Sequence, residues 1–187
     1  MSTPLSDVTP LCIADPSTFW PWQRWPEFSR WPDPAHTTVI VPLAGMADWG
    51  LGHPLDAEEM VLMQVLRTAS QARPASRSLA VMPPGRFILG PDSGCAFAVD
   101  PPVAHSMLAE VAGSLAASGF KRVVFYNASP WNEELIAAAA RDQRVANAIP
   151  EVCPAARGSG KLVKIGSARC AYATSLRDAP ARRPASA

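Results

Sequence analysis

The sequence predicts a single-domain α/β fold in which a mostly parallel sheet carries helices on both faces. Segments rich in β-branched residues alternate with amphipathic or alanine-rich segments, as strands linked by crossover helices require. The length of 187 residues, 48% of them hydrophobic, is enough to bury one sizeable core. We expect this domain over 37–176, after a Pro- and Trp-rich N-terminal leader at 1–36 and before a tail at 177–187 whose composition predicts disorder.

The first half of the domain contains three predicted strands and one predicted helix. His36–Leu43 (HTTVIVPL) is the clearest strand, and its continuous apolar character predicts burial on both faces. Asp56–Ser70 is expected to be a helix, because its apolar residues recur at helical spacing and its acids, including Glu58 and Glu59, suit a first turn. Ser78–Met82 is a second strand that two prolines end, and Gly94–Val99 is a third.

The second half continues the same alternation. A helix rich in Ala and Leu is predicted over Pro102–Ser118, with Gly119 as its C-terminal cap. Residues 121–129 (KRVVFYNAS) follow as a strand, and Glu133–Arg141 as another helix. Helices between successive strands imply parallel strand pairing.

The leader concentrates four tryptophans, Trp20, Trp22, Trp25 and Trp31, in a short stretch. Prolines at 21, 26 and 32 argue against a long helix there. Two interpretations stay open: the indoles anchor a partner subunit or a ligand, or they pack over the chain's own domain.

The composition argues against several classes of function. The net charge of +1, with acids and bases interspersed, gives no basic surface for nucleic acid. No apolar run approaches the roughly 18 residues that span a bilayer, and the N-terminus lacks the pattern of a signal peptide. The four cysteines are widely spaced, which predicts free thiols in a reducing compartment: Cys12, Cys95, Cys153 and Cys170. We therefore expect a cytoplasmic protein.

Two loops qualify as site loops because they follow predicted strands, at the sheet edge where α/β proteins bind ligands. The first reads PLAGMADWG…HPLD (42–56), and the second ends the segment SGFKRVVFYNASPWN (118–132). These segments, together with ARCAYATS (168–175), resemble the creatininase family of metal-dependent amidohydrolases over roughly 40–175. Its members carry P-V-G-S-x-E-Q-H-G-x-H-L-P-L-x-x-D, N-G-H-G-G-N and H-A-G-x-x-E-T-S in this order. Asn127 and Asn132 keep the spacing of the two asparagines of the second motif.

The ligand positions of these motifs have changed. With Pro42 and Gly50 in register, the family's first glutamate falls on Ala47 and its histidine on Trp49. The other metal-binding positions fall on Ser129 in the second motif and on Ala168 and Ala173 in the third, although Thr174 and Ser175 are kept. The closing aspartate of the first motif is assigned to Asp56. Alanine and tryptophan cannot coordinate a metal, and serine does so poorly.

The resemblance therefore predicts a creatininase-like protein that has lost most metal ligands and has no cofactor. It implies a non-catalytic subunit or binding protein in a homo-oligomer, or in a hetero-oligomer with an active relative. Trp49 and Trp131 lie in the loops that face the metals in the family. Their indoles either fill the space left by the ions, line an apolar ligand pocket or dock a partner.

Two alternatives keep an enzymatic activity. Asp48, His53 and Asp56 would bind a single zinc or manganese ion if the loop folded back on itself, giving a diverged metal-dependent amidohydrolase acting on cyclic amide or related C–N bonds. The other alternative is a serine nucleophile at Ser129, on a strand-to-helix turn. That turn lacks the flanking glycines of a nucleophile elbow, and no partner histidine is evident.

Overall fold

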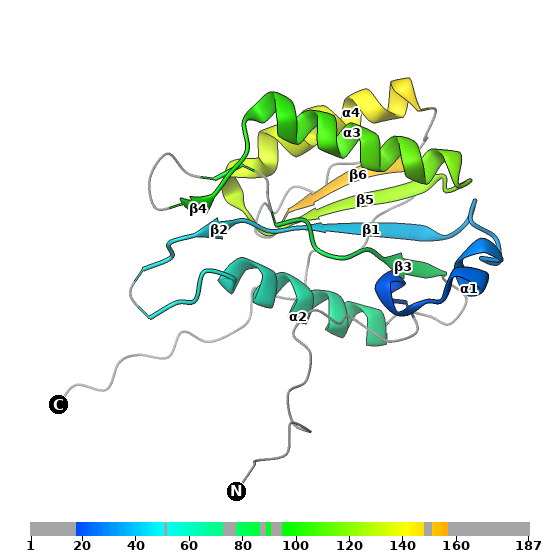
Figure 1. Ribbon diagram of the computed structural model, residues 1–187, viewed down its shortest axis with the longest axis horizontal. Coiled ribbons are helices and arrows are strands. Elements are labelled where there is room, and N and C mark those ends of the chain that lie inside the picture. Colours follow the sequence, from blue (N-terminus) through cyan, green and yellow to red (C-terminus); the bar gives the residue numbers. More distant parts are fainter. Residues whose placement is uncertain are drawn as a thin grey trace, which may run out of the picture. The chain divides into compact units, whose positions relative to one another are not determined.

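A computed structural model describes residues 18–50, 52–72, 78–86, 89–90, 95–147 and 151–156. Its main sheet has four strands in the order β3-β1-β5-β6, and all neighbouring pairs are parallel (Figure 1). The strands are β1 (Thr38–Leu43), β3 (Leu79–Val81), β5 (Arg122–Asn127) and β6 (Glu151–Ala156).

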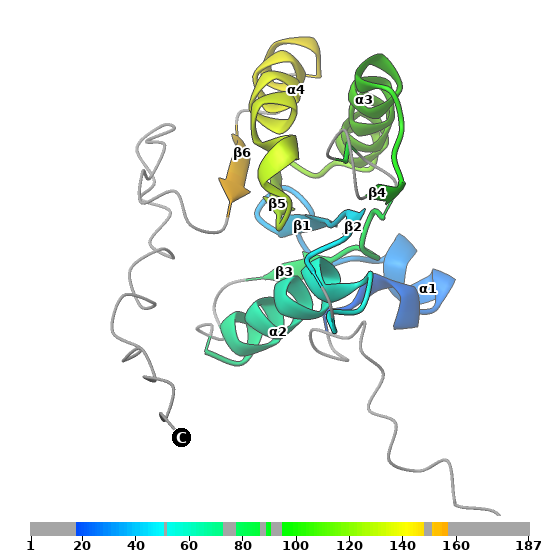
Figure 2. The same cartoon turned by 90° about the vertical axis from the view of Figure 1, so that its left-hand side faces the viewer.

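Helices cover both faces of this sheet, so the predicted fold class is confirmed. Helix α2 (Ala57–Ala72) lies on one face, and α3 (Pro101–Ala117) and α4 (Glu133–Ala146) lie on the other (Figures 1 and 2). Gly119 ends α3 as expected: its φ of 90° is a left-handed conformation that glycine adopts without a Cβ penalty.

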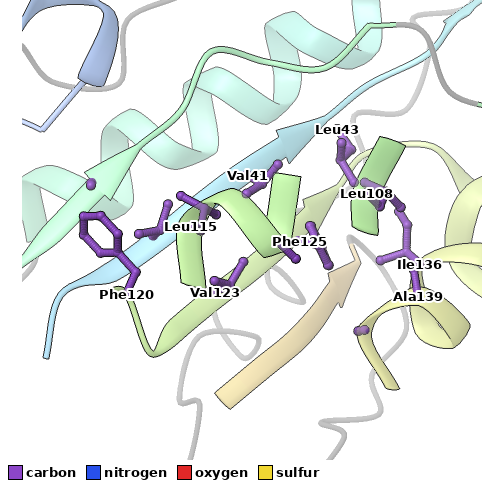
Figure 3. Packing of buried hydrophobic residues seen from close by; sticks show 13 residues of the cluster. Val41, Leu43, Leu108, Leu115, Phe120, Val123, Phe125, Ile136 and Ala139 are labelled. Atoms are coloured by element: carbon purple, nitrogen blue, oxygen red, sulfur yellow. The ribbon is translucent and has the colours of Figure 1, made fainter. Parts of the chain in front are cut away.

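The largest core cluster lies between the sheet and the α3–α4 pair (Figure 3). Val41 and Phe125 come from the strands, and Leu108 and Ile136 from the helices, each at most 5% exposed. A second cluster under α2 joins that helix to β3 and to the N-terminal segment; its buried members are Phe19, Leu62, Met63, Leu66 and Val81. Apolar faces on both sides of the sheet therefore hold the layers together.

Two strands differ from the sequence-based expectation. The strand predicted over Gly94–Val99 forms as β4 (Cys95–Phe97), but it pairs antiparallel with β2 (Met46–Ala47) in a separate two-stranded sheet. Strand β6 was not predicted, since Pro154 interrupts its sequence pattern. The structure accommodates this proline because β6 is an edge strand, where one side of the backbone needs no ladder partner.

The described part of the leader packs against the domain and also exposes aromatic rings. Short helices η2 (Trp20–Trp22) and α1 (Trp25–Ser29) confirm that no long helix forms there. The ring of Trp20 contacts Phe120 edge-on at a centroid distance of 5.3 Å, whereas Trp22 and Trp25 are 50% and 73% exposed. Both interpretations of the indoles therefore keep support.

Residues 1–17 and the predicted tail at 177–187 lie outside the described residues, so the two expected domain boundaries stay predictions. Among the described helices, none combines the length and apolar character needed to cross a bilayer.

Candidate functional site

The two predicted site loops meet at the carboxyl edge of the sheet. Strands β1 and β5 end level with each other, because Leu43 pairs with Asn127 in the parallel register. The Ala128 N–H continues the contact by donating to the Leu43 carbonyl at 3.0 Å. Just beyond this pair, two residues after Leu43 and one after Ala128, the Gly45 N–H donates to the Ser129 Oγ at 3.0 Å. The level strand ends thus bring together the first and second family motifs, which the sequence had placed after two separate strands.

Glu58 in the first turn of α2 lies at the centre of this meeting point. Its side chain is buried, with the residue only 5% exposed, and three donors surround its carboxylate. The Gly45 N–H donates to Oε2 at 2.6 Å, the Trp49 indole N–H donates to Oε1 at 3.0 Å, and the Ser129 hydroxyl donates to Oε2. All three donors are uncharged, and the N-terminal end of the α2 dipole adds a favourable potential for the carboxylate.

Asn127 fixes the backbone that carries Ser129. The Ser129 N–H donates to Asn127 Oδ1 at 3.0 Å, and Asn127 Nδ2 donates to the Ser129 carbonyl at 2.6 Å. Such a side-chain turn sets the direction of the residue that follows a strand. Ser129 is 1% exposed, so its hydroxyl faces Glu58 and Gly45 and not solvent.

Trp49 and Trp131 pack against each other over this network. Their ring centroids are 5.4 Å apart and their planes are inclined by 35°. Trp49 is 44% exposed, so one indole forms part of the surface while its N–H reaches the buried carboxylate. Beside it, the Trp131 Nε1 and both amide atoms of Asn132 are buried without a hydrogen-bond partner among the described residues.

The neighbouring acid, Glu59, has a different environment from Glu58. Arg86 donates two hydrogen bonds to the Glu59 carboxylate, from Nε to Oε2 at 2.6 Å and from Nη2 to Oε1 at 2.9 Å. Glu59 is therefore held in an ion pair that fastens the segment after β3 to α2.

The residues predicted for a rebuilt metal site do not converge. Asp48 is exposed and accepts a hydrogen bond from the Gly50 N–H at 2.7 Å; His53 is also exposed, and Asp56 is partly exposed. The parts of the chain that the structure describes contain no cluster of three or more His, Cys, Asp or Glu side chains able to hold a metal ion. Ala47 is buried in β2, and Ala168 and Ala173 lie outside the described residues.

Sequence reasoning missed the role of Glu58, which it treated as an ordinary first-turn acid. The signal was in the motif itself. Counted without gaps from Pro42, the same register that places Ala47 and Trp49 also matches Pro54 and puts the closing acid on Glu58, two residues beyond Asp56. The structure places the Glu58 carboxylate in the loop network, with Trp49 as one of its donors.

The resemblance implies a divalent metal centre, and the residues at this site do not fit one. Of the positions in the first two motifs, only Glu58 offers an anionic ligand, since Ala47, Trp49 and Ser129 hold the others. Both oxygens of Glu58 already accept hydrogen bonds from neutral groups, and a metal would have to displace them.

The network leaves no room for a side chain at Gly45. A Cβ there would lie 2.9 Å from Ser129 Oγ and 3.1 Å from Glu58 Oε2. We expect Gly45→Ala to lower the free energy of unfolding by about 1–3 kcal/mol, the usual cost of overpacking. Gly113→Ala is the matched control, because its Cβ would meet nothing nearer than 3.8 Å within helix α3, where alanine is favoured. Urea denaturation of both variants tests this, and equal effects would contradict it.

Comparisons with known proteins agree with this fold. The structure described as "Creatininase Mn" superposes with a TM-score of 0.61 at 16% identity, covering 75% of this chain and 58% of that one. A putative creatinine amidohydrolase from Bacteroides fragilis NCTC 9343 gives a TM-score of 0.60 at 16% identity, covering 76% of this chain and 56% of that one. The chain thus spans less than three fifths of the length of these structures. No match was found among curated protein sequences.

The family assignment follows from the sequence itself. The model of the family described as "Creatininase: Creatinine amidohydrolase" matches residues 23–184, which is most of the chain and includes all three motif segments. This chain belongs to the creatininase family.

Proposed function

We propose that this protein is a creatininase-family member without the family's metal chemistry, acting as a non-catalytic subunit or binding protein in an oligomer. The observation that carries the proposal is that both carboxylate oxygens of the buried Glu58 already accept hydrogen bonds from the protein. Its carboxylate is saturated by Gly45, Trp49 and Ser129, two of which stand at positions where the family has a histidine. The family is one of metal-dependent amidohydrolases. Under the proposal, this member has lost the metal centre on which that hydrolysis depends.

Several features support a binding or structural role for the site. Hydrogen bonds among neutral groups and a buried carboxylate tie three segments together: the loop after β1, the start of α2 and the loop after β5. The Trp49–Trp131 pair covers them on the outside. We further propose that the partner is a second copy of the chain or an active relative, and that the protein is cytoplasmic, as its widely spaced cysteines predict.

Metal analysis of the purified full-length protein tests the proposal. After growth with added zinc and manganese, and after dialysis, we expect far less than one metal ion per chain by plasma mass spectrometry. An active creatininase prepared in parallel is the positive control; one of the matched structures is described as "Zn-Zn type" and another as "Creatininase Mn". Stoichiometric metal would overturn the proposal.

The alternative, a diverged amidohydrolase of cyclic amide or related C–N bonds, draws support from family membership. It makes a separate prediction for the same experiment: bound metal should be lost on Asp56→Ala and on His53→Ala, the residues of its ligand set. Metal that is retained in both variants but lost on Glu58→Gln would place the ion at Glu58 and contradict the ligand set of this alternative.

A further inference from the structure

The first turn of α2 and the loop before it form an exposed surface that is both apolar and acidic. Trp49, Leu55 and Met60 are 44%, 49% and 39% exposed. Asp48 is exposed and Asp56 partly exposed in the same segment, and residues 44–66 contain no Lys or Arg, while the other two acids, Glu58 and Glu59, are buried. We name these five residues, Asp48, Trp49, Leu55, Asp56 and Met60, the acidic surface.

The last turns of α4 form a surface of opposite charge. Val145 is 84% exposed, and Arg141, four residues earlier, lies on the same face of the helix. Arg144, adjacent to Val145, is partly exposed, and no salt bridge of either arginine is found among the described residues. The nearby Asp142 is engaged with His105 of α3 at 3.1 Å. We name Arg141, Arg144 and Val145 the basic surface.

A simpler explanation accounts for part of this pattern. Acids at the start of α2 and an arginine near the end of α4 both suit helix dipoles. The dipoles do not explain why a large indole and three aliphatic or thioether side chains are exposed beside these charges, since exposed apolar groups gain nothing from a dipole. Apolar centres surrounded by charge are typical of association surfaces.

The two surfaces lie at opposite edges of the sheet. Helix α2 begins at the carboxyl edge, where Glu58 contacts Gly45 just beyond β1. Helix α4 begins at that same edge, after β5, and its 14 residues carry the chain about 21 Å back towards the amino edge. The helices also cover different faces of the sheet (Figure 2). One molecule therefore cannot bring its own two surfaces together, whereas two molecules can.

We propose that the acidic surface of one molecule docks on the basic surface of a second copy of this chain. The inference rests on the proposed function in naming the partner of its oligomer. Trp49 is the apolar anchor, against Val145 of the partner subunit, and the two arginines face Asp48 and Asp56. Because the two contacting surfaces differ, the association is heterologous and builds a closed ring or an open chain.

Charge reversal on each surface tests the proposal with the full-length chain in sedimentation velocity. The wild type is expected to self-associate at low salt and to dissociate at about 1 M NaCl, where the Debye length is about 3 Å. The variant Asp48→Lys/Asp56→Lys and the variant Arg141→Glu/Arg144→Glu should each be monomeric alone. An equimolar mixture should associate again, since each reversed surface then meets its complement. Arg30→Glu/Glu110→Lys, changed at exposed positions elsewhere, is the matched control and should behave as wild type.

The outcomes separate this inference from the proposed function. A monomeric wild type, a variant that associates undiminished, or a mixture that stays monomeric would each overturn the docking, provided circular dichroism shows folded variants. Association only with a creatininase-family relative would also overturn it. The metal content of the wild-type protein tests the proposed loss of metal chemistry separately, because that measurement involves neither charge-reversal variant.

Discussion

Glu58→Ala is expected to lower the free energy of unfolding by about 3 kcal/mol. The substitution removes the acceptor of two donors, the Trp49 indole N–H and the Ser129 hydroxyl, and leaves the Gly45 N–H with Ser129 Oγ as its remaining acceptor. Each buried polar group without a partner costs about 1–3 kcal/mol, and partial access of water to the half-exposed Trp49 reduces the sum. Urea denaturation monitored by circular dichroism measures the change.

Glu134→Ala is the control for this prediction. Glu134 is also a first-turn acid, in α4, but it is exposed, so its loss should cost less than about 1 kcal/mol. Glu58→Gln adds a test of charge: the amide keeps one acceptor oxygen but turns a donor towards groups that already donate, so an intermediate loss is expected. Similar stability of Glu58→Ala and Glu134→Ala would show that the network contributes little.

Phe125→Ala is expected to have the largest effect on stability, a loss of about 3–5 kcal/mol. Phe125 in β5 is fully buried and lies in the cluster between the sheet and the α3–α4 pair (Figure 3). Truncating it removes apolar contacts from the strand between β1 and β6 and leaves a cavity that close-packed neighbours cannot fill.

Phe97→Ala provides the matched control for Phe125→Ala, because Phe97 is 57% exposed in the small β2–β4 sheet. We expect it to change the unfolding free energy by less than about 1 kcal/mol. Thermal and urea denaturation of the two variants check the contrast. Equal losses would place the main core elsewhere.

Most of the fold could be predicted because hydrophobic periodicity reports burial directly. The β-branched run before Leu43 and the alanine-rich helix ending at Gly119 were both confirmed, with ends displaced by one or two residues. Strand β6 escaped because its sequence, EVCPAA, has neither alternation nor a β-branched run. The pairing of β4 with β2 was not predicted, because a three-residue strand has no sequence pattern that specifies its neighbour.

The location of the site could be predicted from the sequence, but the residues that form its hydrogen-bond network could not. The sequence placed both motif loops at the carboxyl ends of strands, and the structure adds that β1 and β5 are neighbours that end level, so that the loops meet at Gly45 and Ser129. Glu58 was missed because an acid in the first turn of a helix is common for electrostatic reasons alone. The ungapped register of the first motif points to Glu58, and the structure shows how its environment differs from that of Glu59, which is paired with Arg86.

The shared hydrogen bonds of Gly45 have an evolutionary consequence. Its single N–H serves both Ser129 and Glu58, so the closed arrangement depends on several residues at once. Restoring a metal ligand at position 49 alone would remove the indole donor of Glu58 before any ion could replace it. At position 47 it would have to fit a larger side chain where Ala47 is only 1% exposed. Each single step back passes through a less stable intermediate. Under the proposed function, selection for folding alone would resist the return of the metal centre once this network had formed.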